Sequence, residues 1–402
     1  MRPQFVLPVI AMVSPIAFAQ PVWFDQAAAS ARIHDIQVAS GAPAMSAAIV
    51  RLDGQGVGTA VSGVRRFGDP APVTAADRFH VGSNSKAFTA QIAARAVDAG
   101  QISWDTTVDE IFGGQTAIDP GYAGVTLRQL LTHQGGTPQY GSFEDWFPLG
   151  SLPGTPAQQR EKMARNILAA PRAIAPGTSP FERYSNSGFG IAAAMVEQAT
   201  GQAWESMITH TFNTGMGLGV HVGAPGEDGT AQPFGHVVLD GQLVTIGPGD
   251  VLRLPSAIAP AGDLNMSMTD LAEFGRQHLL GMSGLPNTLD ISTSSISVLH
   301  DTTFGEGFFG MGWFDIIEPS LGLDGFGHTG STEAFDSILY VDRVQGFAIA
   351  VASNGTTTGD SEAIGGALVD AMLAMRASVI PAPGAAMIFA AGLLAAAPRR
   401  RR

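Results

Sequence analysis

Strand-forming apolar runs lie near both ends of the body of this chain, and helical patterns fill its middle. Residues 44–51 and 58–65 are β-rich and joined through Asp53-Gly54, which predicts a hairpin. Three more strands and a closing helix are predicted near the other end, at residues 325–329, 334–341, 347–353 and 360–375. The chain must therefore bring its two ends together to build one sheet.

The middle of the chain follows a helical period. Apolar spacing predicts helices at residues 83–99, 126–133, 188–200 and 268–280, and a hairpin at 234–246 that turns at Asp240-Gly241. The predicted fold class is α/β (α+β): an antiparallel sheet flanked by helices plus a mainly helical inserted domain. The sheet part is expected at about 30–104 and 271–376, and the helical insertion at about 105–270.

Composition excludes several classes of function. A net charge of −13 argues against a nucleic-acid binder, which needs basic surface to neutralise phosphates. The 402 residues include no cysteine, which excludes disulfides, thiol nucleophiles and thiolate metal sites. None of the nine histidines lies two, three or four residues from another, and neither a P-loop nor a dinucleotide fingerprint occurs. We therefore expect no metal and no cofactor.

The N-terminal residues 1–19 read as a signal peptide. An arginine is followed by an apolar stretch from Phe5 to Phe18, and Ala17-Phe18-Ala19 offers a small-x-small cleavage site before Gln20. The alternative is a buried N-terminal helix, which Pro3, Pro8 and Pro15 disfavour. We expect an exported protein in the periplasm, cell envelope, or cell surface and medium.

Residues 377–402 also look like a targeting segment. Pro381-Ala382-Pro383 precedes an apolar run and then the basic cluster Arg399–Arg402. This order resembles the PEP-CTERM sorting signal of bacteria, with Ala382 where that family has glutamate. The resemblance implies a sorting enzyme as a partner that removes the tail; the alternative is a C-terminal membrane anchor. We expect membrane contact only through the terminal segments.

One of the chain's two lysines stands three residues after a serine, in Ser83-Asn84-Ser85-Lys86. Residues three apart share a helix face, so the Lys86 amine can reach the Ser83 hydroxyl. Burial can lower the pKa of a lysine until its neutral form accepts a proton. The alternative is a surface lysine near a capping serine.

Two further motifs follow in order. Tyr184-Ser185-Asn186 stands before a predicted helix, where Tyr184 could relay a proton and Asn186 could orient substrate and lysine. His328-Thr329-Gly330-Ser331 ends a predicted strand, whose edge amides could join that of Ser83 in an oxyanion hole. Taken singly, these residues are better explained as a packed tyrosine at a helix start and a structural strand histidine.

Together, S-x-x-K, Y-x-N and H-T-G resemble the ordered signature of class C β-lactamases, D-Ala-D-Ala carboxypeptidases, D-aminopeptidases and related esterases. Three flanking segments agree with the family and extend the similarity over about residues 30–376: 126–133, 260–272 and 310–313. The resemblance implies a β-lactamase/transpeptidase-like fold. It also implies Ser83 as nucleophile, Lys86 and Tyr184 as the proton-transfer pair, and Asn186, His328, Thr329, Gly330 and Ser331 in the substrate cleft and oxyanion hole.

The third motif departs from true β-lactamases of this class, which usually carry lysine where this chain has His328. A neutral histidine holds a substrate carboxylate less strongly than lysine does. We therefore predict a serine hydrolase that works through an acyl-serine on an ester, amide or D-amino-acid peptide bond of a small molecule or peptide, rather than an efficient β-lactamase. The alternative function is a non-catalytic surface-binding protein on the same fold.

Overall fold

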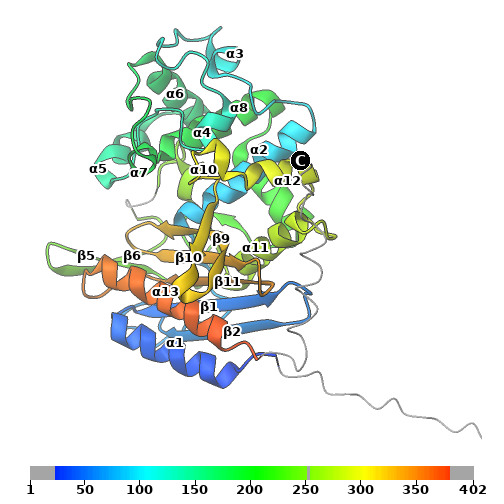
Figure 1. Cartoon of the computed structure of the whole chain (residues 1–402). Coiled ribbons are helices and arrows are strands. Elements are labelled where there is room, and N and C mark those ends of the chain that lie inside the picture. Colours follow the sequence, from blue (N-terminus) through cyan, green and yellow to red (C-terminus); the bar gives the residue numbers. More distant parts are fainter. Residues whose placement is uncertain (1–22, 251–253, 381–402) are drawn as a thin grey trace, which may run out of the picture.

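The computed structural model describes residues 23–250 and 254–380 (Figure 1). The predicted signal peptide and nearly all of the predicted C-terminal tail lie outside the described residues. In this view a sheet with its covering helices forms the lower part of the molecule, and a helical part stands above it.

A six-stranded antiparallel sheet runs in the order β2-β1-β11-β10-β9-β8. Its strands are β1 (Ala44–Arg51), β2 (Val57–Gly63), β8 (Phe314–Glu318), β9 (Leu323–Ser331), β10 (Asp336–Asp342) and β11 (Phe347–Ser353). β1 pairs with the whole of β11, from Met45 opposite Ser353 to Arg51 opposite Phe347. The first and last strands of the chain are thus neighbours, which confirms the predicted sheet built from both ends.

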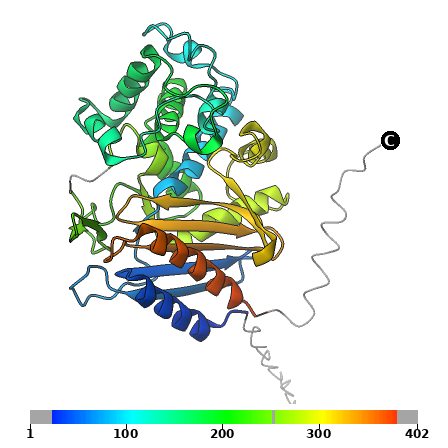
Figure 2. The same cartoon turned by 60° about the vertical axis from the view of Figure 1, so that its left-hand side comes forward.

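The pleat of the sheet sends alternate side chains to two separate cores. On β10, Ile338 and Tyr340 face the helices α1 (Gln26–Ser40) and α13 (Ser361–Ala377). Leu339 and Val341 face the opposite core, where α11 (Met268–Met282) packs on β1, β10 and β11. Figure 2 shows α1 and α13 side by side on one face of the sheet, opposite the face that α11 covers.

The helical part surrounds two long buried helices, α2 and α8. Its members and neighbours are α2 (Ser85–Asp98), α3 (Val108–Phe112), α4 (Leu127–Leu131), α5 (Phe143–Trp146), α6 (Pro156–Ala169), α7 (Pro180–Arg183), α8 (Asn186–Thr200), α9 (Trp204–Ile208), α10 (Ala259–Gly262) and α12 (Thr293–Leu299). α8 begins where Ser185 accepts the Gly188 N–H and ends at Gly201, whose φ of 70° reverses the chain.

Small strands complete the fold. β3 (Phe79–His80), β7 (Leu264–Met266) and β4 (His221–Val222) form a three-stranded sheet, and β5 (Gly235–Leu239) pairs with β6 (Gln242–Ile246). The stretch 105–270, predicted as the helical insertion, thus holds β4 to β7 as well as helices. Among the described residues, no helix combines the length and apolar character needed to cross a membrane.

Most predicted elements are confirmed, with shifts at their ends. Both hairpins form, and β11 has the predicted bounds. The helix predicted at 126–133 spans only Leu127–Leu131, because Thr126 caps it and the chain turns left-handed at His133. The helix predicted from Ser83 begins at Ser85, after a 3₁₀ turn, η1 (Gly82–Asn84). Among the elements that the prediction missed are α1, whose amphipathic signal is weak, the helix α6 and the edge strand β8.

Candidate active site

Ser83 lies on the turn η1, between β3 and the buried helix α2. The turn is fastened to the sheet by Asn84, whose Nδ2 donates to Ser337 Oγ on β10 at 2.9 Å. Ser337 Oγ donates in turn to the Val81 carbonyl at 2.9 Å. Ser83 itself stays partly exposed. A rigid, buried support therefore presents one accessible hydroxyl.

Lys86, one turn further on, is fully buried. Its Nζ lies 3.0 Å from Ser83 Oγ, 2.8 Å from Asn186 Oδ1 and 2.8 Å from the Ala261 carbonyl oxygen. Burial holds the pKa of Lys86 well below its usual value. In the neutral amine, two N–H groups satisfy Asn186 and Ala261, and the lone pair points at the Ser83 hydroxyl. This is the geometry of a general base.

Tyr184 lies between α7 and α8 and faces the same serine. Burial raises the pKa of its phenol, and a hydrogen bond with Ser83 opposes that shift only in part. Lys86 Nζ lies 4.7 Å from the centre of the Tyr184 ring. The phenol therefore keeps its proton at neutral pH and suits the role of a proton donor or relay better than that of a resting phenolate.

Asn186 is oriented by contacts at both ends of its side-chain amide. Its Oδ1 accepts from Lys86, and its Nδ2 donates to the Tyr140 carbonyl at 2.8 Å. Its backbone N–H donates to the Gln139 carbonyl at 2.9 Å. The structure thus brings Ser83, Lys86, Tyr184 and Asn186 into one cluster, from two separate stretches of the chain.

The free edge of β9 completes this cluster. β8 pairs only with residues 323–327, so the third motif extends beyond it. A Cβ on Gly330 would lie 2.0 Å from the Val81 carbonyl oxygen, and one on Gly82 would lie 2.6 Å from Ser331 N. Such close contact requires glycine at both positions. A Cβ on Gly330 would also lie 2.9 Å from Ser83 N, so the backbones of the first and third motifs lie against each other.

The side chains of the third motif alternate in direction. Thr329 and Ser331 are exposed, whereas His328 is only 2% exposed and packs against Phe314 at 4.3 Å between ring centres. Burial lowers the pKa of His328 to about 3. His328 thus lies behind Tyr184 as a neutral ring, with centres 6.4 Å apart, rather than on the open edge of the strand.

Three groups near the cluster received no role from the sequence. His133 stacks on Tyr184, Ala261 supplies a carbonyl to Lys86, and Arg183 pairs with Glu306 through two 2.8 Å hydrogen bonds. His133 and Ala261 lie within the segments 126–133 and 260–272, which resemble the family. That resemblance is the sequence signal that could have pointed to them. The Arg183–Glu306 pair joins residues 123 positions apart and leaves no local pattern.

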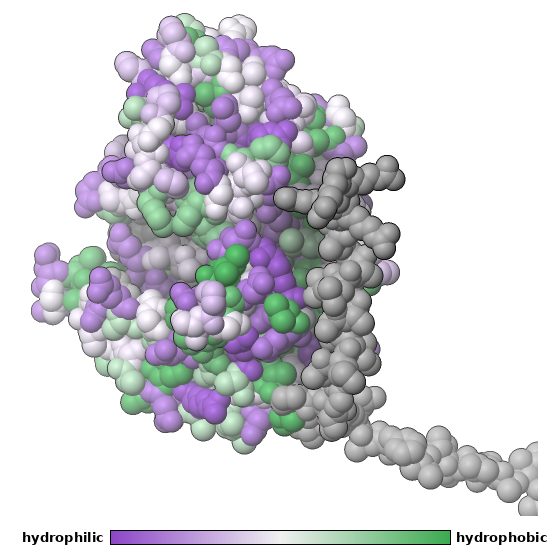
Figure 3. Space-filling model, in the orientation of Figure 1, coloured by the Kyte–Doolittle hydropathy of each residue, from purple (hydrophilic) through white to green (hydrophobic). Residues whose placement is uncertain are grey.

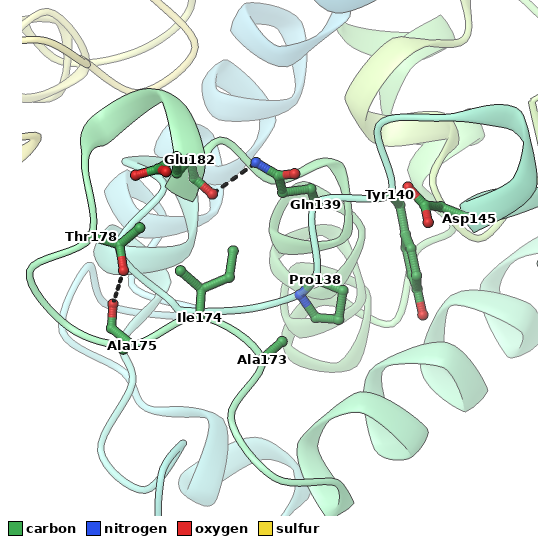
Figure 4. A pocket seen from close by; sticks show the side chains of 9 residues that line it. All are labelled: Pro138, Gln139, Tyr140, Asp145, Ala173, Ile174, Ala175, Thr178 and Glu182. Atoms are coloured by element: carbon green, nitrogen blue, oxygen red, sulfur yellow. Dashed lines mark hydrogen bonds between the residues drawn. The ribbon is translucent and has the colours of Figure 1, made fainter.

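A cavity of about 550 Å³ is lined in part by Gln139 and Tyr140, whose carbonyls accept hydrogen bonds from Asn186 (Figure 4). Tyr140 forms one wall, and the loop that carries Ala173, Ile174, Ala175 and Thr178 lies opposite. Asp145 and Glu182 add carboxylates, and its lining includes no basic side chain. In the space-filling view the surface is hollowed where the helical part meets the sheet part (Figure 3). Among the described residues, no group of three or more acidic or histidine side chains could hold a metal ion.

A family model described as Beta-lactamase matches residues 29–372. The chain belongs to the beta-lactamase family. Penicillin-binding protein 4 of Amycolatopsis lactamdurans is 27% identical over 308 residues, which cover 73% of this chain and 76% of that protein. This family uses the β-lactamase/transpeptidase-like fold that the sequence predicted.

Solved structures show the same fold. A D-stereospecific amidohydrolase from Streptomyces sp. superposes with a TM-score of 0.63 at 22% identity, covering 86% of this chain and 98% of that one. The D-amino acid amidase from Ochrobactrum anthropi SV3 gives a TM-score of 0.65 at 20% identity, with coverage of 87% and 98%. Membership of this family makes the chain a serine hydrolase. The similar proteins are named for amide hydrolysis or for penicillin binding.

Proposed function

We propose that this protein hydrolyses amide or ester bonds of D-amino-acid derivatives through an acyl-Ser83 intermediate. One observation carries the proposal: Lys86 is fully buried against three uncharged partners, Ser83, Asn186 and the Ala261 carbonyl. A buried ammonium without a counter-ion is costly, so the amine is held neutral beside the hydroxyl it can deprotonate.

The steps follow from the geometry. Lys86 takes the proton of Ser83 as its oxygen attacks the carbonyl carbon, and the oxyanion accepts hydrogen bonds from the amides of Ser83 and Ser331. Tyr184 donates its proton to the leaving nitrogen or oxygen and regains one from the Lys86 ammonium. Water then attacks the acyl-serine by the reverse proton route, which releases the acid and restores Ser83.

The substrate class follows from the described basic side chains of the site, none of which is free to bind a carboxylate. Lys86 is buried, Arg183 is neutralised by Glu306, and His328 is buried and uncharged. The described part of the cleft therefore offers no free cation to a substrate carboxylate. D-amino-acid amides and esters fit this cleft better than peptides ending in a free D-alanine carboxylate, in line with the names of the amidase-like structures.

The test compares wild-type protein and Ser83→Ala on D-alanine nitroanilide, a short-chain nitrophenyl ester, an N-acyl-D-alanyl-D-alanine and a chromogenic β-lactam. We expect release from the first two, none from the Ser83→Ala variant, and weak turnover of the two carboxylate substrates. Silence of the wild type on all four would favour the non-catalytic binding protein. Equal activity in both proteins would mean that Ser83 is not the nucleophile.

We also propose export, with cleavage before Gln20 and sorting or anchoring through residues 377–402. The support is the order of charged, apolar and small residues at the two ends. Expression with both ends present, followed by fractionation and N-terminal sequencing, tests this. A cytoplasmic protein that keeps Met1 would contradict it, and tail removal would separate the sorting signal from the membrane anchor.

A further inference from the structure

The ring of Tyr184 rests on the ring of His133. The ring centres are 4.3 Å apart and the planes differ by 29°. His133 is 2% exposed, and Phe309 and Phe189 pack around it at 4.7 and 5.3 Å between centres. A stacked pair enclosed in this way fixes the plane of the phenol.

His133 also holds the backbone next to Tyr184. The Ser185 N–H donates to His133 Nδ1 at 3.0 Å, so that nitrogen carries no proton and the ring is the Nε2–H tautomer. Burial keeps the pKa of His133 well below its usual value. Protonation would break the Ser185 contact and bury a charge among aromatic rings.

The backbone of His133 adopts a conformation that residues other than glycine rarely adopt. Its φ is 60°, in the left-handed region, directly after the last turn of α4. The following segment then lies along Ser185 and Asn186, where Thr137 Oγ1 contacts Ser185 Oγ at 2.8 Å. Strain of this kind persists where the surroundings fix it, and it concentrates at functional sites.

We propose that His133 is a positioning residue, which sets the ring of Tyr184 and the amide of Ser185 so that the phenol reaches Ser83. The inference rests on the proposed function, because it concerns the relay in that reaction. His133 directs its Nδ1 hydrogen bond to Ser185 and its ring to Tyr184, not to the nucleophile. Its loss should therefore slow proton transfer and leave substrate binding intact.

Three variants separate the two contacts. His133→Asn keeps an acceptor near Ser185 and tolerates a positive φ, but loses the stack. His133→Phe keeps a ring and loses the acceptor, and His133→Ala loses both. We expect kcat of His133→Ala to fall roughly 100-fold, as for a reacting group misplaced by about 1 Å, with KM within about twofold. His133→Asn should recover roughly tenfold of that loss.

His278→Asn is the matched control. His278 is also buried, its Nδ1 lies 3.0 Å from His300 Nε2, and it packs on Phe274 and Trp313, away from Tyr184. Its replacement should lower the melting temperature and leave kcat of the folded protein within about threefold. The rate of Ser83 labelling by a fluorophosphonate gives a second readout that does not depend on deacylation.

The outcomes are distinct. A wild type that neither turns over substrate nor is labelled removes the proposed function, and this inference with it. An active wild type with unchanged kcat in His133→Ala overturns the positioning role alone. So does an equal loss of kcat in His278→Asn, which would mean general destabilisation. If His133→Ala does not fold, the ranking of His133→Asn above His133→Phe in kcat carries the test, and the reverse ranking contradicts it.

Discussion

Lys86 and Arg160 are both fully buried, and their surroundings differ. Arg160 on α6 donates to Glu197 and Glu205 through four hydrogen bonds of 2.6–3.0 Å and to the Ser256 carbonyl at 2.9 Å. Lys86 on α2 has only uncharged partners. Burial alone lowers the pKa of both groups, but the two carboxylates raise that of Arg160 above its usual value.

The comparison shows that burial does not decide the charge of a basic side chain. Arg160 uses its five N–H donors on acceptors that favour its charged form, and it ties α6 to α8 and α9. Lys86 loses hydration without gaining a counter-ion, so its neutral form is favoured and can act as a base. One site is built for cohesion and the other for proton transfer.

Replacing Lys86 should give the largest effect on activity. In Lys86→Met the base is lost at nearly constant volume, and we expect kcat/KM to fall by roughly 10⁴-fold or more. The melting temperature should not fall, because the lysine is held neutral at a cost to stability. Lys86→Arg introduces a side chain that cannot lose its proton, and this variant should be equally inactive. Activity in Lys86→Arg near the wild-type level would contradict the role of a neutral base.

Replacing Arg160 should have the opposite consequence. Arg160→Met leaves Glu197 and Glu205 facing each other without a cation, and we expect a loss of about 3 to 5 kcal/mol in the free energy of unfolding. kcat per folded molecule should stay near that of the wild type. Denaturant unfolding and active-site titration measure the two quantities. A large loss of kcat at unchanged stability would place Arg160 in the reaction and end the contrast with Lys86.

The sequence predicted the site better than it predicted the surroundings of the site. Ser83 and Lys86 share a local motif, and the turns at Tyr184 and Gly330 carry residues whose order was informative. The burial of His328 could not be predicted in this way, because it depends on Phe314 from the unpredicted strand β8 and on Tyr184. A strand pattern gives the alternation of side chains but not what covers them.

The same limit applies to the fold. Strands with strong apolar character, such as β11, were predicted at their observed bounds. α1 was missed because alanines dominate it and only Ala29, Ile33 and Ser40 are buried along its length. The Arg160 cluster was missed as well, since Arg160, Glu197 and Glu205 meet only when α6, α8 and α9 pack together.

Acid should reveal further bases that are buried in their neutral form. Burial lowers the pKa of His278 to about 3, so between that value and about 6.5 the unfolded chain binds a proton that the folded chain does not. The contribution of His278 to the free energy of unfolding is therefore fully present above about pH 6.5. It falls as the pH drops toward 3, and the loss reaches roughly 2 to 3 kcal/mol at pH 4.5.

The measurement is denaturant unfolding at pH 7 and pH 4.5, on wild type and His278→Asn. The variant should be less stable at pH 7 but should lose less on acidification. An equal loss in the two proteins would show that His278 does not titrate as its burial demands. Arg160 keeps its charge throughout this range and offers no such signature.

The smallest expected effect comes from the ion pair next to Tyr184. Arg183 is 6% exposed and Glu306 is 54% exposed at the side chain, so the pair lies between the buried Arg160 cluster and an ordinary surface pair. Glu306→Gln keeps one hydrogen bond and removes the charge, which should lower kcat by roughly three- to tenfold at unchanged KM. Glu333→Gln, which replaces an exposed glutamate at a turn with positive φ like that of Glu306, is the control and should change neither constant.

If both variants behave like the wild type, Arg183 is held by packing alone. A rise in turnover of carboxylate substrates in Glu306→Gln would instead show that the freed Arg183 reaches the cleft, and that this glutamate helps to set which substrates the enzyme accepts.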